Sequence, residues 1–259
     1  MSLAPSPLLQ SLIELSLRAG AEIMAIYATD FSAKEKGDLT PVTEADEAAE
    51  RIILTGLAKI DGAVPVISEE AASAGRIPDV AAKFFLVDPL DGTKEFISRN
   101  GEFTVNIALV ENGVPVAGVV YAPALKRIFW GEKGHGAAHG KVENEVAGHW
   151  QRLAVRALPA EGATVVASRS HRDQATEDWL KKIKVKSLCS AGSSLKFCLV
   201  AAAEADLYPR FGRTMEWDTA AGHAVLLAAG GKVVTVDGPV LTYGKRTRGY
   251  DNPGFIASA

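Results

Sequence analysis

Cysteine is scarce in this chain of 259 residues, and the two that occur, Cys189 and Cys198, do not form a metal-type or redox-type pair. This scarcity argues against a disulfide-stabilised scaffold and favours a reducing compartment, so we expect a cytoplasmic protein. An apolar stretch of about 18 residues, enough to span a membrane, is absent, as is a signal-peptide pattern at the N-terminus. The segment 8–27 is amphipathic, which leaves peripheral association with the inner membrane as the weaker alternative.

A sustained basic stripe is also missing. The chain has 28 Lys and Arg against 31 Asp and Glu, for a net charge of -3. This balance argues against a nucleic-acid polymer as the main partner. A small anionic ligand remains compatible, because a bound cation and a few basic side chains can supply local positive charge. With 47% hydrophobic residues, the chain can bury a large core as one domain or two lobes.

Two carboxylates stand directly after the apolar segment 84–87, in the run Asp88-Pro89-Leu90-Asp91-Gly92-Thr93. Proline fixes its own φ and glycine allows a tight bend, so both acid side chains and the Leu90 carbonyl can converge on one point. Carboxylates this close repel each other and raise each other's pKa unless a proton or a metal lies between them. The run therefore predicts a site for a hard divalent cation.

Further acids stand where regular elements begin or end. Glu69 and Glu70 follow the predicted strand 64–67, and Asp218 opens an apolar helix over 219–229. Asp46 lies near the start of a predicted helix over 44–60, for which Thr43 is the expected N-cap. The alternative for Asp46 or Asp218 alone is simple complementation of the helix dipole, worth roughly 0.3 to 1 kcal/mol.

The order of predicted elements changes along the chain. The first part has helices at 7–28 and 44–60, strands at 64–67 and 84–88, a hairpin of 103–110 and 114–121 around Asn112-Gly113, a strand at 127–130 and a glycine-rich loop at 131–140. Strands and helices then alternate, at 163–167, 173–183, 185–188, 194–204, 206–208, 219–229 and 232–236. We expect an α+β lobe at 1–155 and an α/β lobe at 156–259, with the boundary inside 141–156.

Four segments together resemble the inositol monophosphatase superfamily of lithium-sensitive, magnesium-dependent phosphatases. They are Pro41-Val42-Thr43-Glu44-Ala45-Asp46, Ser68-Glu69-Glu70, Asp88-Pro89-Leu90-Asp91-Gly92-Thr93 and Trp217-Asp218-Thr219-Ala220-Ala221-Gly222. The resemblance spans nearly the whole chain, and four ordered matches are far more specific than one. It implies an α/β fold, a layered αβαβα sandwich, with two or three Mg²⁺ ions. Ser68 departs from the glycine that many members carry there.

The resemblance also implies roles for individual residues. It assigns the metal ions to the side chains of Glu69, Asp88, Asp91 and Asp218 and to the backbone carbonyl of Leu90. Asp46 and Thr93 are expected to activate the attacking water, and Glu70 to hold another metal-bound water. For Thr93 the alternative is an N-cap of the helix that follows Gly92.

Three further runs are similar to the 3'(2'),5'-bisphosphate nucleotidase branch of this superfamily. They are Lys94-Glu95-Phe96, Gly192-Ser193-Ser194-Leu195-Lys196-Phe197-Cys198 and Leu207-Tyr208-Pro209-Arg210-Phe211. This similarity implies hydrolysis of adenosine 3',5'-bisphosphate to AMP and phosphate, with 3'-phosphoadenylyl sulfate as a further substrate, and a place in sulfur metabolism. The alternatives are an inositol or sugar monophosphatase and a metal-dependent binder without turnover.

Substrate contacts are expected from residues around these runs. Gly92 and Lys94 flank Thr93, and Lys94 can meet an additional anionic group. Ser193, Ser194 and Lys196 resemble a phosphate cradle at a helix start, with plain helix capping as the alternative. Arg169 and His171 follow the strand 163–167 at a carboxyl edge where open α/β sheets bind ligands. Arg210 is suited to a bidentate grip on phosphate, or else is an ordinary exposed arginine. The sequence leaves the oligomeric state open.

Overall fold

The computed structural model describes residues 3–29, 40–168 and 173–259, with the side chains of residues 40–42 left out. In this part of the chain the helices are α1 (Pro7–Tyr27), α2 (Thr40–Asp61), α3 (Glu69–Ser73), α4 (Thr93–Ile97), α5 (Gln174–Leu180), α6 (Leu195–Ala201), α7 (Glu216–Ala228) and the 3-10 turn η1 (Arg246–Arg248). None of them is both long and apolar enough to cross a membrane.

Two β-sheets organise the fold. The first has seven strands in the order β1 to β7, namely β1 (Val66–Ser68), β2 (Lys83–Asp91), β3 (Thr104–Glu111), β4 (Val114–Ala122), β5 (Arg127–Glu132), β6 (Gly136–Glu143) and β7 (Val146–Arg152). The second has the order β11-β12-β10-β8-β9, namely β11 (Lys232–Thr235), β12 (Phe255–Ser258), β10 (Leu207–Arg210), β8 (Ala163–Ser168) and β9 (Val185–Ala191). The predicted lobe boundary at 155/156 lies between the last strand of one sheet and the first of the other.

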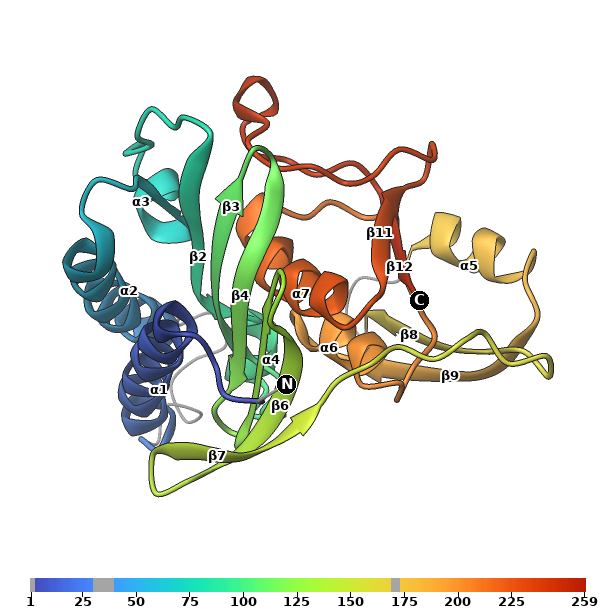
Figure 1. The fold of residues 1–259 in the computed structure, drawn as a ribbon, viewed down its shortest axis with the longest axis horizontal. Helices are drawn as coiled ribbons and strands as arrows, with labels where there is room; N and C mark the ends of the chain where they lie inside the picture. The colour runs from blue at the N-terminus through green and yellow to red at the C-terminus, as the bar shows by residue number, and fades with distance from the viewer. Residues whose placement is uncertain (1–2, 30–39, 169–172) are drawn as a thin grey trace.

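The elements stack in layers (Figure 1). Helices α1 and α2 cover one face of the first sheet, α6 and α7 lie between the two sheets, and α5 lies beyond the second sheet. One apolar core fills the space under α1 and α2, and another surrounds α6 and α7. The layered αβαβα sandwich expected from the resemblance is confirmed.

The first two helices have different beginnings. Ser6 caps α1, because its side chain accepts a hydrogen bond from the Leu9 amide at 3.2 Å. Helix α2 begins at Thr40, earlier than predicted, so Thr43 lies inside the helix and its expected N-cap role is wrong. The start of α7 was also placed too late, since Glu216, Trp217 and Asp218 already belong to its first turn.

The Asn112-Gly113 hairpin between β3 and β4 is confirmed. Both residues have positive φ, 51° and 77°, as the two-residue turn that matches strand twist requires. The loop predicted over 131–140 is wrong, because β5 continues to Glu132 and β6 begins at Gly136. A Cβ at Gly140 would lie 2.6 Å from the Gly148 carbonyl oxygen, so this glycine permits close packing within a strand pair.

Candidate functional site

Three carboxylates from distant parts of the sequence converge at one end of the first sheet. Glu69 begins α3 directly after β1, Asp88 lies on β2, and Asp218 lies in the first turn of α7. Strands β1 and β2 are parallel, with Ser68 opposite Val87, so the residues that follow them are neighbours. One oxygen of each carboxylate lies within 4.8 Å of the others. The predicted meeting of these acids is therefore present, and their role as ligands stays a prediction.

The end of β2 bends where proline and glycine were expected to bend it. Its register with β3 shifts between Asp88 and Asp91. The Leu90 amide donates to Oδ1 of Asp88 at 3.1 Å, and Asp91 Oδ2 accepts from the Ser194 amide at 2.8 Å. Leu90 and Asp91 line the same cleft as Glu69, Asp88 and Asp218. All five predicted metal-binding residues thus face one cleft.

Burial and mutual repulsion disfavour ionised carboxylates in this cluster. Burial raises the pKa of Asp218 to about 8 and that of Glu69 to about 7, with Asp91 adding to both shifts. The pKa of Asp88 is raised well above its ordinary value by burial, then by Glu69 and Asp91. Such a group must take up protons or gain a cation. Because all the donors are carboxylate oxygens, the residues fit a hard ion such as Mg²⁺.

Two further acids lie beside the cluster. Asp46 is 6% exposed, and burial followed by repulsion from Glu70 and Glu69 raises its pKa to about 8. The pKa of Glu70 is raised by burial and then by Glu50. Because α2 begins at Thr40, Asp46 lies beyond the first helical turn, and the dipole alternative for it is wrong. For Asp218 that alternative is confirmed, since its Oδ2 accepts from the Met215 amide at 2.8 Å, while its role as a ligand stays a prediction.

Thr93 is the first residue of α4 and lines the cleft. Its alternative role as an N-cap is wrong, because Gly92 occupies that position with φ 105°. Any side chain at residue 92 would collide with Ser193 Oγ and approach the Phe103 Cα to 3.2 Å. The glycine therefore allows the β2 end and the α6 start to meet, which sets the width of the cleft beside Thr93.

The cleft has a volume of about 330 Å³. The residues that line it on the side of the first sheet are Glu69, Asp88, Leu90, Asp91, Gly92, Thr93, Lys94 and Glu95, which we call the first wall. The second wall consists of Ser168, Ser193, Lys196, Phe197, Tyr208, Arg210, Arg213, Thr214, Asp218 and Thr219. Of the predicted substrate contacts, Gly92, Lys94, Ser193, Lys196 and Arg210 thus face the cleft. Arg169 and His171 lie outside the described residues.

The expected phosphate cradle at the start of α6 is largely used by the protein itself. Ser193 Oγ contacts the carbonyl oxygens of Asp91 and Glu102 at 2.7 and 2.8 Å, and Ser194 Oγ donates to the Asp218 carbonyl at 2.5 Å. The Ser194 amide, which is expected to donate a hydrogen bond to a phosphate, donates instead to Asp91 Oδ2. Ser194 occupies the N-cap position of α6, but its side chain makes no cap hydrogen bond to the helix. Both serines connect the two walls, so cross-linking describes them better than capping or a free cradle, while their substrate role stays a prediction.

Lys196 is buried, and its ammonium donates to the carbonyl oxygens of Ser193 and Ala191 at 2.5 and 3.3 Å. Burial lowers its pKa to about 8, against the opposing attraction of Asp91. Arg210 is partly buried, and its guanidinium donates to the carbonyl oxygens of Gly212 and Arg213. The ordinary exposed arginine is therefore not what the structure has: Arg210 is oriented within the cleft.

Sequence reasoning did not assign Arg213, Thr214 or Thr219 to the cleft, although all three line it. Arg213 and Thr214 follow the run 207–211 that carries Arg210, so extending that run by a few residues would have included them. Thr219 lies directly after Asp218 in the helical first turn. It also belongs to the segment 217–222 that carries the family resemblance, which could have singled it out.

The chain belongs to the inositol monophosphatase family, whose profile matches residues 4–258. It is 47% identical over 96% of its length to a Salmonella typhimurium protein named 3'(2'),5'-bisphosphate nucleotidase CysQ, of which the match covers 98%. The identity is 45% to the protein of the same name from Escherichia coli strain K12, over 97% of this chain and 99% of that protein. The crystal structure of CysQ from Bacteroides thetaiotaomicron superimposes with a TM-score of 0.82 at 40% identity, over 96% of each chain.

Proposed function

We propose that this protein is a metal-dependent 3'(2'),5'-bisphosphate nucleotidase that hydrolyses adenosine 3',5'-bisphosphate to AMP and phosphate. The observation that carries the proposal is the cluster of Glu69, Asp88 and Asp218 in a cleft whose second wall is rich in cations. The near full-length relatives named 3'(2'),5'-bisphosphate nucleotidase CysQ support the same substrate class. The proposal includes 3'-phosphoadenylyl sulfate as a further substrate.

Two or three Mg²⁺ ions, when bound, would neutralise charge on the phosphoryl oxygens and make a water molecule more acidic. Glu69, Asp88, Asp91 and Asp218, with the Leu90 carbonyl, would hold these ions. Asp46, with its pKa raised by burial, is suited to accept the proton of the attacking water through the Thr93 hydroxyl. Glu70 would orient a second water. Because these acids are largely buried, few bulk water molecules can compete with the substrate for the ions.

The second phosphate requires positive charge away from the metal-binding carboxylates. Arg210 is held by two backbone carbonyls, and a guanidinium oriented in this way can bind a phosphate with little loss of side-chain entropy. Lys94 approaches from the first wall and Lys196 contributes buried positive charge between the walls. A bisphosphate therefore matches the charge pattern of the cleft better than inositol 1-phosphate, which has no second anionic group.

Two unpaired cysteines and Mg²⁺ dependence fit a cytoplasmic setting, which we include in the proposal. An inositol monophosphatase is the second candidate, favoured by the structural match to the Anabaena inositol monophosphatase, with a TM-score of 0.75 at 25% identity. A binder without turnover is disfavoured, because Asp46 and Thr93 are both in place beside the cluster.

Phosphate release with Mg²⁺ from a panel of esters tests the proposal. The panel comprises adenosine 3',5'-bisphosphate, 3'-phosphoadenylyl sulfate, 3'-AMP, 5'-AMP and inositol 1-phosphate. We expect the bisphosphate to be the best substrate and 5'-AMP, the product, to remain intact. Faster release from inositol 1-phosphate would support the second candidate. Tight nucleotide binding without phosphate release would support the non-catalytic binder.

A further inference from the structure

The first turn of α7 must be held in place for Asp218 to meet Glu69 and Asp88, because these acids come from different elements. The N-cap residue of α7, Met215, makes no side-chain cap hydrogen bond to the helix. Its amide is bonded to Asp218 instead, at 2.8 Å. The metal-binding side chain thus also caps its own helix, and its position depends on where Met215 is held.

Asn252, which is 4% exposed, holds this turn from a distant part of the chain. Its side-chain nitrogen donates one N–H to the Met215 carbonyl at 2.8 Å, and its second N–H is shared between Thr219 Oγ1 at 3.1 Å and Thr214 Oγ1 at 3.2 Å. Its backbone amide donates to the Thr214 carbonyl at 2.9 Å. A carbonyl oxygen can only accept, so the contact with Met215 fixes which end of the amide points to the helix.

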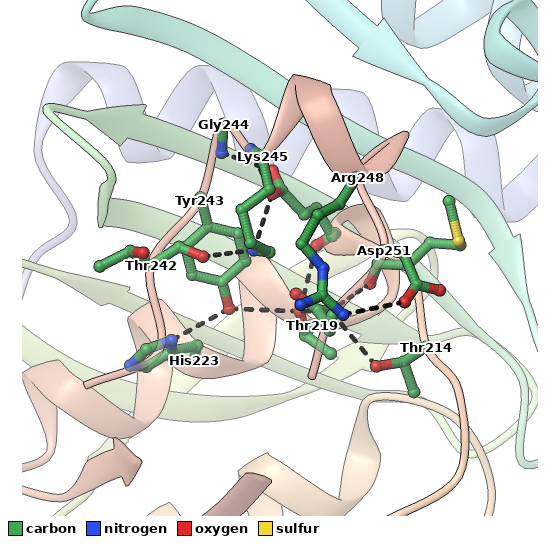
Figure 2. Close-up of polar contacts among 12 residues, drawn as sticks. Thr214, Thr219, His223, Thr242, Tyr243, Gly244, Lys245, Arg248 and Asp251 are labelled. Atoms are coloured by element: carbon green, nitrogen blue, oxygen red, sulfur yellow. Dashed lines mark hydrogen bonds and ion pairs between the residues drawn. The ribbon is translucent and has the colours of Figure 1, made fainter. Parts of the chain in front are cut away.

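The segment 243–245 holds Glu216, which is the first residue of α7 and is fully buried. Its carboxylate accepts from the amides of Gly244 and Lys245 at 2.7 and 2.8 Å and pairs with the Lys245 ammonium at 2.7 Å. Tyr243 donates through its hydroxyl to Thr219 Oγ1 at 3.2 Å, and its oxygen contacts His223 Nδ1 at 3.0 Å. Figure 2 shows the side chains of Tyr243, Thr219 and His223 in this chain of contacts.

We infer that Asn252 is a positioning residue for metal binding, which fixes the α7 turn that carries Asp218 without itself touching the ions or the substrate. Asn252 contacts Met215 and Thr219, one on each side of Asp218, whereas Tyr243 contacts Thr219 and His223, which both follow Asp218. Partners behind a ligand of this kind set metal affinity, and their loss typically weakens binding about 10- to 100-fold. The inference rests on the metal site of the proposed function.

Mn²⁺ alone, followed by electron paramagnetic resonance, measures affinity without any substrate. We expect Asn252→Ala to raise the Mn²⁺ dissociation constant about tenfold or more, because Asp218 is no longer held against the other ligands. We expect Tyr243→Phe to shift it in the same direction by a smaller factor. Thermal stabilisation by Mg²⁺ should decrease in the same order.

Asp206→Ala is the matched control. Asp206 is equally buried, and its carboxylate is bonded to Arg156 and to the Thr164 amide. It directly precedes β10, whereas Arg210 stands at the other end of that strand. Its loss should lower the melting temperature and leave Mn²⁺ affinity unchanged. Wild-type Mn²⁺ affinity in Asn252→Ala would overturn the inference, and if that variant does not fold, wild-type affinity in Tyr243→Phe would do so. Failure of the nucleotide assay with Mn²⁺ affinity reduced as expected would count against the proposed function only.

Discussion

The two walls of the cleft differ in charge. The first wall carries the acids Glu69, Asp88, Asp91 and Glu95 together with Lys94, whereas the second wall carries Lys196, Arg210 and Arg213 together with Asp218. The first wall comes from consecutive elements near β2, and the second from α6, β10 and α7. The division suggests that the ester phosphate and its metal ions belong to the acidic side, and the remaining anionic group of the substrate to the basic side.

Asp218 is the exception in the second wall, and its removal should have the largest effect. Asp218→Asn keeps an oxygen that can accept from the Met215 amide, so the helix cap is retained while the charge is lost. Turnover should fall more than about a hundredfold, because one of the carboxylates proposed to hold the ions is replaced by a neutral amide. Phosphate release at saturating Mg²⁺ measures this, with circular dichroism to verify the fold. Activity within tenfold of wild type, which is the loss expected for a residue that only supports a ligand, would contradict the ligand role.

Arg210 tests the basic side of the comparison. Arg210→Ala should lower kcat/KM for adenosine 3',5'-bisphosphate by about 10- to 100-fold, the range expected for losing a hydrogen-bonded charge on phosphate. Hydrolysis of 3'-AMP, which lacks the 5'-phosphate, should change much less. The exposed Arg18 on α1 provides a control, since Arg18→Ala removes the same charge far from the cleft. Equal losses on both substrates would show that Arg210 supports the site only structurally.

Lys94 is the cation of the first wall, and its loss should reduce activity less than the loss of Arg210 does. We expect Lys94→Thr to reduce kcat/KM for the bisphosphate about fivefold, the magnitude of one exposed ion pair. The loss on 3'-AMP should be smaller. The ratio of the two kcat/KM values is the measurement. An unchanged ratio would mean that Lys94 does not distinguish a bisphosphate from a monophosphate. The second anionic group of the substrate would then be bound by the second wall alone.

The pH dependence of metal-free stability tests the buried acids in and beside the cleft. The pKa values of Glu69, Asp46 and Asp218 are raised to about 7, 8 and 8, so the folded form holds more protons than the unfolded form below these values. The free energy of unfolding should therefore fall as pH rises from about 6.5 to 8.5. Two groups oppose this trend at the ends of the range. Lys196, with its pKa lowered to about 8, does so only near the upper end, and His223, with its pKa lowered from 6.5 to about 3, does so only near the lower end, where the unfolded form still loses its imidazole proton.

Thermal unfolding in the presence of a chelator, at about pH 6.5 and about pH 8.5, measures this difference. We expect the melting temperature to be several degrees lower at the higher pH, and Mg²⁺ to restore more stability there. Asp46→Asn should reduce the difference, since one of the titrating groups is removed. A melting temperature that rises across the same range would mean that the carboxylates are already ionised and compensated without metal.

The sequence predicted the acidic wall better than the rest of the site, for physical reasons. Asp88 and Asp91 lie within five residues of each other, so a local bend determines their geometry. The contacts that Asn252, Tyr243 and Glu216 make around α7 join residues 20 or more positions apart, and polar residues in buried networks carry no periodic pattern. Long-range register and packing, which decide such contacts, are not encoded in a short motif.

Glycine misled the prediction for a related reason. Glycines in 131–140 suggested a loop, but Gly131 lies in β5, where the Val225 Cα is only 2.6 Å from the position a Cβ would take. Turn and close-packing roles select the same residue, so composition alone does not separate them. By contrast, the glycine after Asn112 was predicted correctly, because the dipeptide and the flanking alternation both indicate a hairpin.

Gly118 and Gly131 lie on adjacent strands under α7, and each has helix backbone within 2.6 Å of where a Cβ would be. The depth at which Asp218 sits is therefore set by backbone resting on backbone, with no side chain able to yield. A single added methyl at either position would lift the helix and carry its carboxylate away from its partners. Inactivating substitutions are therefore expected in the middle of the first sheet as well as around the cleft. Substitutions meant to change the specificity of the enzyme should keep glycine at both positions.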